Sequence, residues 1–167
     1  IKDNIMIVGV DADSFFDYNN FQSWETLQSE IQKIDGVKSV YSISDAVDLL
    51  KDKKEKKLII ESLFDSIDNQ SQLDEAFSKL KTLPFYRNTL YNDSASVMLL
   101  ALDNDFITSD KRINLIDSII GLGDIYESET NKAIRYSGLP YIRTINSELI
   151  KKEVGLFIFL ALFVTAL

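Results

Sequence analysis

The chain has 167 residues, 46% of them apolar, and its 26 acidic residues exceed its 18 basic ones, giving a formal net charge of −8. This composition supplies a core for one ordinary domain or two small subdomains, and the charge argues against nucleic acid as a partner. The absence of cysteine excludes disulfides, thiolate chemistry and cysteine-based zinc sites, and the absence of histidine removes the commonest general base and metal ligand.

A strand, a helix and a second strand are predicted first. Residues 6–12 (MIVGVDA) form a short β-rich run, consistent with a strand covered on both faces. Ser23 is predicted to cap a helix that ends before Gly36, which stands where glycine often follows a helix. Residues 37–43 (VKSVYSI) predict a second strand, parallel to the first, with a right-handed crossover. The apolar stripe of the helix comprises Trp24, Leu27, Ile31 and Ile34.

A helical insertion is predicted to follow. Residues 44–45 offer an N-cap to a short helix over 46–50, and 58–67 has the pattern of an amphipathic helix. A clearer helix begins at Ser71 and stops at Pro84, because the residue before a proline is disfavoured in helical conformation. The inward positions of this last helix are Leu73, Phe77, Leu80 and Leu83.

The run 51–57 (KDKKEKK) within this insertion is nearly all charged. Its simplest interpretation is a solvated helix face or loop. The alternative is a contact with anionic lipid, because clustered lysines near a membrane are attracted to its surface. The two acids of the run and the negative charge of the chain oppose that alternative.

A β-hairpin over 85–102 is predicted next, with a turn at 92–94 and an apolar strand at 95–102 that should be fully buried. Ser109 is expected to cap the following helix, which Gly121 and Gly123 interrupt before a second helical piece over 124–131. The apolar stripe of that helix is Ile113, Ile116, Ile119 and Ile120. A last strand is predicted at 133–136 and a turn at 138–140.

The resulting order is strand, helix, strand, helical insertion, β-hairpin, helix and strand. This is the split βαβ arrangement, in which two helices lie on one face of a mainly antiparallel sheet. We therefore predict an α+β, ferredoxin-like fold with a helical insertion and a C-terminal helix.

Catalytic motifs are not found in the sequence, which has no Gly-rich phosphate loop, G-x-S-x-G elbow or H-E-x-x-H helix. Asp11, Asp13 and Asp17 could suggest a metal site. A calcium loop of the EF-hand type would continue with Gly and an acidic residue where this chain has Phe16 and Gln22, so we interpret them as ordinary acids at a strand end.

A second acidic group, 103–105 (DND), lies in a predicted loop, where such residues favour turn formation alone. The sequence therefore predicts no enzyme. It assigns no catalytic, cofactor-binding, metal-binding or substrate-binding residue.

Five aromatic residues crowd into ten positions near the start: Phe15, Phe16, Tyr18, Phe21 and Trp24. Core or lid packing is the simpler interpretation, because Trp24 already belongs to a helix stripe. An apolar cleft for a hydrophobic ligand is the alternative. The sequence does not separate the two.

The C-terminal residues 155–167 (GLFIFLALFVTAL) carry no charge and follow a polar, helix-like stretch at 147–153. A bilayer crossing needs roughly 20 apolar residues, and a run of about 10–14 also suits a buried core helix. We expect an extracytoplasmic domain over 1–153 and, over 154–167, the start of a membrane helix of which the chain holds only part.

Four segments together carry a family resemblance. They are an opening strand followed by a helix, 36–42 (GVKSVYS) matching a G-V-x-x-V-x-S pattern, 92–93 (ND) followed by the strand 94–102, and 136–140 (YSGLP) before a long helix that enters the membrane. In this order they resemble the first periplasmic loop (porter) domain of RND-superfamily exporters, especially the MMPL-like branch. The resemblance covers most of the chain.

The resemblance implies a transporter of the bacterial inner membrane, with this domain facing the periplasm and a similar second periplasmic domain in the same protein. Such domains would receive hydrophobic or amphipathic, lipid-like substrates during efflux or export driven by proton flow. The family's proton-coupling residues lie in membrane helices outside this chain. A long hairpin for docking to an outer-membrane channel, as in the antibiotic-efflux members, is not evident in the sequence.

Two other interpretations stay open. The first is the periplasmic domain of an ABC-type permease that transmits motion to a partner, which would also precede a membrane helix and contain small α/β subdomains. The second is a soluble binding module with a buried C-terminal helix. That module requires the domain to cover Leu156, Phe157, Phe159, Leu160 and Phe163.

Overall fold

A computed structural model describes residues 3–12, 17–51 and 57–165. The strands are β1 (Ile5–Asp11), β2 (Val37–Tyr41), β3 (Val47–Lys51), β4 (Leu58–Ser62), β5 (Ala95–Leu102) and β6 (Ile134–Ser137). The helices are α1 (Tyr18–Gln32), α2 (Gln70–Lys81), α3 (Asn104–Ile107), α4 (Lys111–Thr130) and α5 (Leu139–Thr165), with a short 3₁₀ turn, η2 (Ile43–Asp45).

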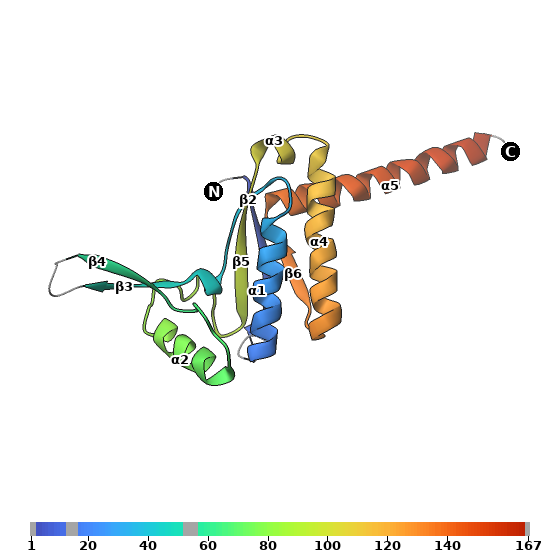
Figure 1. The fold of residues 1–167 in the computed structure, drawn as a ribbon. Helices are drawn as coiled ribbons and strands as arrows, with labels where there is room; N and C mark the ends of the chain where they lie inside the picture. The colour runs from blue at the N-terminus through green and yellow to red at the C-terminus, as the bar shows by residue number, and fades with distance from the viewer. Residues whose placement is uncertain (1–2, 13–16, 52–56, 166–167) are drawn as a thin grey trace.

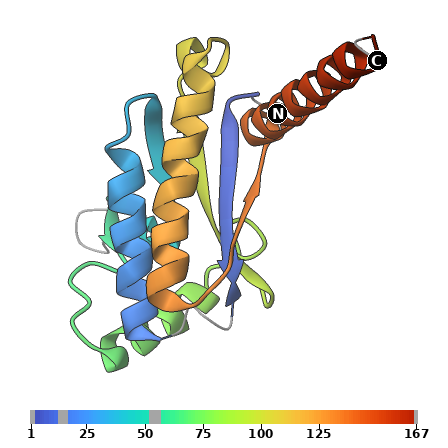
Figure 2. The same ribbon diagram turned by 90° about the vertical axis from the view of Figure 1, so that its right-hand side faces the viewer.

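The main sheet has the strand order β2-β5-β1-β6, and every neighbouring pair is antiparallel. In this register Val8 of β1 lies between Met98 of β5 and Tyr136 of β6. Strands β1 and β2 are therefore parallel and separated by β5, while α1 and α4 lie side by side on one face of the sheet (Figures 1 and 2). The predicted α+β, ferredoxin-like split βαβ fold with an insertion is confirmed.

The core lies between this sheet and the two helices and continues into the insertion, where Leu73 and Leu80 of α2 are fully buried. Trp24 and Ile31 of α1 are fully buried, as are Met98 and Leu100 of β5. The predicted stripe on α1 is confirmed, with Ile34 beyond the helix and partly buried against the core. The strand at 95–102 is buried at every second residue only, so the prediction of a fully buried strand is wrong and the second face of the sheet is more open.

Helix α1 begins earlier than the sequence predicted. Asp17 is the N-cap, and its carboxylate accepts hydrogen bonds from the backbone N–H groups of Asn19 (3.0 Å) and Asn20 (3.3 Å). Ser23 therefore lies inside the helix. The aspartate satisfies N–H groups of the first turn that have no partner within the helix.

The insertion contains a two-stranded sheet and one helix. Helix α2 confirms the helix predicted from Ser71, and Asn69 caps it. The helices predicted at 46–50 and 58–67 are wrong, because 47–51 and 58–62 pair as β3 and β4. Ser44 and Asp45, the predicted N-cap, lie inside η2, whose N-cap is Ser42, and Ala46 then has an extended backbone (ψ 136°) that leads into β3.

The predicted hairpin over 85–102 is reduced to single bridges, such as that between Tyr91 and Ser96. The turn at 92–94 is confirmed, since the Asn92 side chain accepts hydrogen bonds from the N–H groups of Ser94 and Ala95, both at 2.8 Å. Helix α4 runs through Gly121 without a break, so the predicted division of this helix is wrong.

Helix α5 begins directly after Gly138, at the position predicted to be a turn, with Pro140 in its first turn. Proline is well tolerated there, because the N–H that it lacks would have no partner within the helix. The first turns of α5 pack on α4 and β1, and the remainder extends away from the domain (Figure 1). The insertion lies on the opposite side of the domain.

Candidate functional site

The three aspartates weighed as metal ligands do not form a metal site in the described part of the chain. Asp11 ends β1 and makes an ion pair with Arg135 of β6 (3.1 Å), Asp17 caps α1, and Asp13 lies outside the described residues. Among residues 3–12, 17–51 and 57–165, no group of three or more acidic side chains could hold a metal ion.

The second acidic group has a local structural role. Asp103 caps α3, and its side chain accepts a hydrogen bond from the N–H of Asp105 at 2.9 Å. That bond, with help from Lys38 at 3.3 Å, lowers the pKa of Asp103 below its ordinary value. Asn104 and Asp105 belong to the first turn of α3. The predicted loop at 103–105 is therefore the start of a short helix, and the prediction of a purely turn-forming role is wrong.

The five aromatic residues near the start of the chain do not form one cluster over the described residues. Phe21 and Trp24 are fully buried, and Phe21 stacks on Phe64 of the insertion with ring centroids 5.3 Å apart. Trp24 meets Tyr126 of α4 edge to face at 5.9 Å. These two residues are core, as the simpler interpretation expected. Phe15 and Phe16 lie outside the described residues, and Tyr18 packs partly buried against the core.

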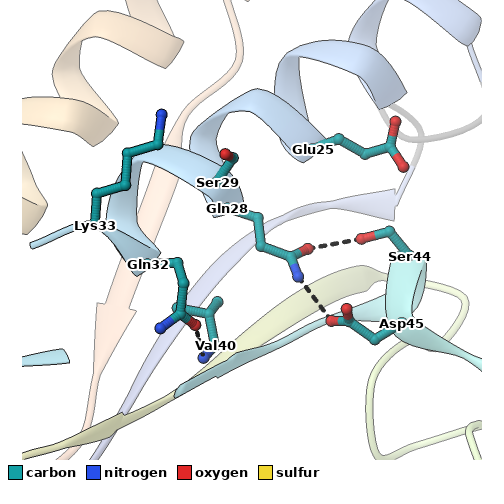
Figure 3. A pocket seen from close by; sticks show the side chains of 8 residues that line it. All are labelled: Glu25, Gln28, Ser29, Gln32, Lys33, Val40, Ser44 and Asp45. Carbon is teal, nitrogen blue, oxygen red and sulfur yellow. Dashed lines mark hydrogen bonds between the residues drawn. The ribbon is translucent and has the colours of Figure 1, made fainter. Parts of the chain in front are cut away.

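A polar groove of about 510 Å³ lies between α1 and the segment from β2 to η2, and the sequence interpretation missed it (Figure 3). Its centre is the Gln28 amide, which donates to the Asp45 carboxylate at 2.7 Å and accepts from the Ser44 hydroxyl at 2.6 Å. Gln32 accepts a hydrogen bond from the backbone N–H of Val40 at 2.8 Å. A polar stripe on α1 at helical spacing was the signal available in the sequence.

The groove residues mostly bond to one another. Ser42, fully buried beneath the groove, donates its backbone N–H to Asp45 at 2.8 Å, and Lys33 pairs with Glu30 at 2.6 Å. The bonds of Gln28 and Gln32 fix η2 and the outer edge of β2 to α1. The groove is thus a structural network, and we assign it no ligand.

Glu25 lies at one end of the groove, and Lys33 lies at the other (Figure 3). Burial raises the pKa of the Glu25 carboxyl above 4.5, and the nearby charge of Asp45 adds to the effect. The folded state therefore holds this proton more tightly than the unfolded state does. Protonated Glu25 therefore stabilises the folded state. This contribution to the free energy of unfolding is complete below pH 4.5 and is lost as the pH rises through the raised pKa of the folded state.

Replacing Glu25 by glutamine is expected to raise the free energy of unfolding at neutral pH, because it removes a carboxylate that is partly desolvated and close to Asp45. We expect a gain of no more than about 0.5 kcal/mol, the usual range for a surface substitution. Below pH 4.5 the gain should vanish. Urea unfolding at both pH values measures it, with the exposed Glu129→Gln as control; a gain equal at both pH values would contradict this reasoning.

The most extensive exposed apolar surface of the described chain is the outer part of α5. From Val154 onward this part has no charged residue, and its side chains are exposed on all sides, because successive helical residues point about 100° apart. The exposed fractions are 59% for Leu156, 72% for Phe157, 64% for Phe159, 47% for Leu160 and 56% for Phe163. The soluble module with a buried C-terminal helix is therefore wrong, since the domain covers none of these five residues.

None of the helices over the described residues combines the length and the apolar character that a membrane crossing requires. Helix α5 continues without a break through the predicted domain boundary at 153–154, where Lys151, Lys152 and Glu153 are exposed. The polar part and the apolar part are thus two halves of one helix.

The chain was compared with protein-family models, with curated proteins and with solved structures, and nothing matched in any of the three comparisons.

Proposed function

We propose that this chain is the periplasmic porter domain of a proton-driven exporter of the RND superfamily, of its MMPL-like branch, in the bacterial inner membrane. The substrates would be hydrophobic or amphipathic, lipid-like molecules. The domain would work with a second periplasmic domain and the membrane helices of the same protein. No enzymatic role is proposed.

The observation that carries the proposal is the outer half of α5. A helix that is apolar on every side belongs in an apolar environment, either a protein core or a lipid bilayer. The described chain offers no core to this half, since Phe157 and Val164 are 72% and 70% exposed. We therefore propose that this half lies in a lipid bilayer, a full crossing of which takes roughly 20 apolar residues.

The base of α5 supports a role in transmitting motion. Pro140 and Thr144 are buried against the domain, and Tyr141 packs on Tyr136 of β6 with ring centroids 5.5 Å apart. Arg143 of the same helix faces Asp3 near the start of β1 at 3.9 Å. A membrane helix that moves during an export cycle would carry the sheet with it through these contacts.

The test uses the full-length protein, expressed in cells loaded with a hydrophobic fluorescent dye. An exporter of this class lowers dye accumulation, and a protonophore abolishes the effect while ATP depletion at a maintained proton gradient does not. Activity that requires ATP hydrolysis, together with an ATPase subunit that co-purifies, would favour the ABC-type permease and overturn the proposal.

A further inference from the structure

The turn of α5 just before its apolar half carries two unpaired lysines. Lys151 and Lys152 are exposed, and neither makes an ion pair or a side-chain hydrogen bond with the described residues. Elsewhere on the domain, many basic side chains pair with a carboxylate. These are Lys33, Lys38, Lys79, Arg87, Arg135 and Arg143. Positive charge without a protein partner thus lies directly where the apolar surface of α5 begins.

The spacing along α5 relates these lysines to the headgroups of a bilayer. In the bilayer location proposed above, with Val154 at the edge of the hydrocarbon, the headgroup layer would be roughly 5–7 Å thick. A helix along the bilayer normal rises about 1.5 Å per residue, so Lys152 and Lys151 would lie within roughly 5 Å of that edge. Glu153 shares the layer, whereas Glu148 would lie about 9 Å out, beyond it. Two positive charges and one negative charge of α5 would therefore meet the headgroups.

We propose that Lys151 and Lys152 bind the phosphate groups of anionic phospholipids in the leaflet that α5 enters. An ammonium group donates hydrogen bonds to phosphate oxygens and attracts their charge. Each lysine near an anionic membrane surface strengthens the attraction by a factor of roughly five. The two side chains point about 100° apart around the helix, so they would contact different lipid molecules.

The adjoining apolar surface favours a lipid over an acidic protein as the partner of these lysines. From Val154 onward the side chains are exposed all round the helix, and a lipid bilayer surrounds a helix in the same way. The chain as a whole has a formal net charge of −8, which anionic lipids would repel. Lys151 and Lys152 offset this repulsion at the level where α5 and the headgroups would meet.

This inference rests on the proposed membrane location of α5 and adds the class of lipid that contacts the helix. A test can use one engineered thiol, because the chain has no cysteine. Gly155 is the best position, since a Cβ there meets nothing within 4 Å. It also follows Lys152 by three residues and Lys151 by four, which places it on the same side of the helix as both.

The full chain with Gly155→Cys, labelled with a bimane fluorophore, would be reconstituted in vesicles of equal parts phosphatidylglycerol and phosphatidylcholine. One lipid or the other would carry brominated acyl chains, which quench the fluorophore only on contact, so the two quenching levels give the lipid ratio around α5. With two lysines opposed by one glutamate, we expect phosphatidylglycerol to be enriched about fivefold. Raising the salt from about 0.05 M to about 0.5 M should lower the enrichment, because salt screens these charges.

Paired substitutions assign the enrichment to the two lysines. Lys151→Gln with Lys152→Gln should lower it to about one or below, whereas Lys151→Arg with Lys152→Arg should preserve it, because arginine also binds phosphate. Lys79→Gln with Lys81→Gln is the matched control, since it removes the same charge from α2, which Figure 1 shows on the side of the domain away from α5. The control should keep the enrichment of the unsubstituted chain.

The outcomes separate this inference from the proposed function. Equal quenching by the two brominated lipids, or an enrichment that survives the loss of both lysines, would overturn the inference while leaving α5 in the bilayer. An equal loss in the α2 control would overturn it as well, because the effect would then follow from net charge alone. The absence of quenching by either lipid would contradict the membrane location itself and the inference with it.

Discussion

A Gly138→Ala substitution is expected to destabilise the protein by about 2–5 kcal/mol, through backbone strain of roughly 1–2 kcal/mol and overpacking of roughly 1–3 kcal/mol. Gly138 has a φ of +111°, which side chains rarely adopt. A Cβ here would collide with the carbonyl oxygen of Ile5 and lie 3.0 Å from the Cα of Met6, both main-chain atoms of β1. Neither can move without disturbing the sheet.

Urea unfolding followed by the fluorescence of Trp24, the single tryptophan of the chain, measures this loss. Gly155→Ala is the matched control, because a Cβ there meets nothing within 4 Å. A loss below about 1 kcal/mol, within the range of ordinary substitutions, would show that the junction between β6 and α5 is looser than described.

Two glycines of α4 should respond to alanine in opposite directions. At Gly121 a Cβ meets nothing within 4 Å, so alanine should stabilise the helix by up to about 1 kcal/mol through its higher helix propensity. At Gly123 a Cβ would collide with the Tyr136 hydroxyl and lie 3.0 Å from its Cζ atom. Overpacking of about 1–3 kcal/mol should outweigh the propensity gain there.

The Tyr136 hydroxyl provides an internal check on this pair. Removing it by Tyr136→Phe should recover much of the loss caused by Gly123→Ala, while leaving the effect of Gly121→Ala unchanged. The free energies of unfolding of the single and double variants form a double-mutant cycle. Additive effects at Gly123 and Tyr136 would show that the hydroxyl is not the obstacle.

The same contact explains why the predicted interruption of α4 was wrong. Glycine inside a helical pattern usually lowers the stability of a helix, so Gly121 and Gly123 predicted an interruption. In the structure the Tyr136 hydroxyl lies against α4 at Gly123 and donates to the carbonyl of Ile120 at 3.4 Å, so this position has no room for a Cβ. Contacts between β6 and α4 are not visible in the local pattern of either segment.

The fold was predictable where periodic patterns were long. The stripe of α1 and the strands β1, β2, β5 and β6 were enough to establish the split βαβ order. The pattern failed at 46–50 and 58–67, where short apolar runs suit a helix or a strand equally. Strand pairing between β3 and β4 decides the conformation, and a single sequence does not reveal that pairing.

The candidate sites, too, were predictable where they depend on local sequence and were missed where they depend on tertiary contacts. Asp11 was correctly interpreted as an acid at a strand end, whereas the roles of Asp17 and Asp103 as helix caps were missed, although Asx side chains commonly bond to nearby backbone N–H groups. The groove around Gln28 and Asp45 was missed, since it joins residues 17 positions apart through side-chain hydrogen bonds. The apolar half of α5 was the clearest signal, because neither its charge nor its polarity depends on tertiary contacts.

The proposed insertion of the outer half of α5 into a bilayer can be tested by thiol accessibility. Single cysteines at position 159, in the apolar half, and at the exposed position 146, near the base, are both accessible in the described structure. With the protein in lipid vesicles, the account predicts that a water-soluble maleimide labels position 146 and leaves position 159 at least tenfold less labelled. Equal labelling of the two positions would contradict the membrane location of this helix.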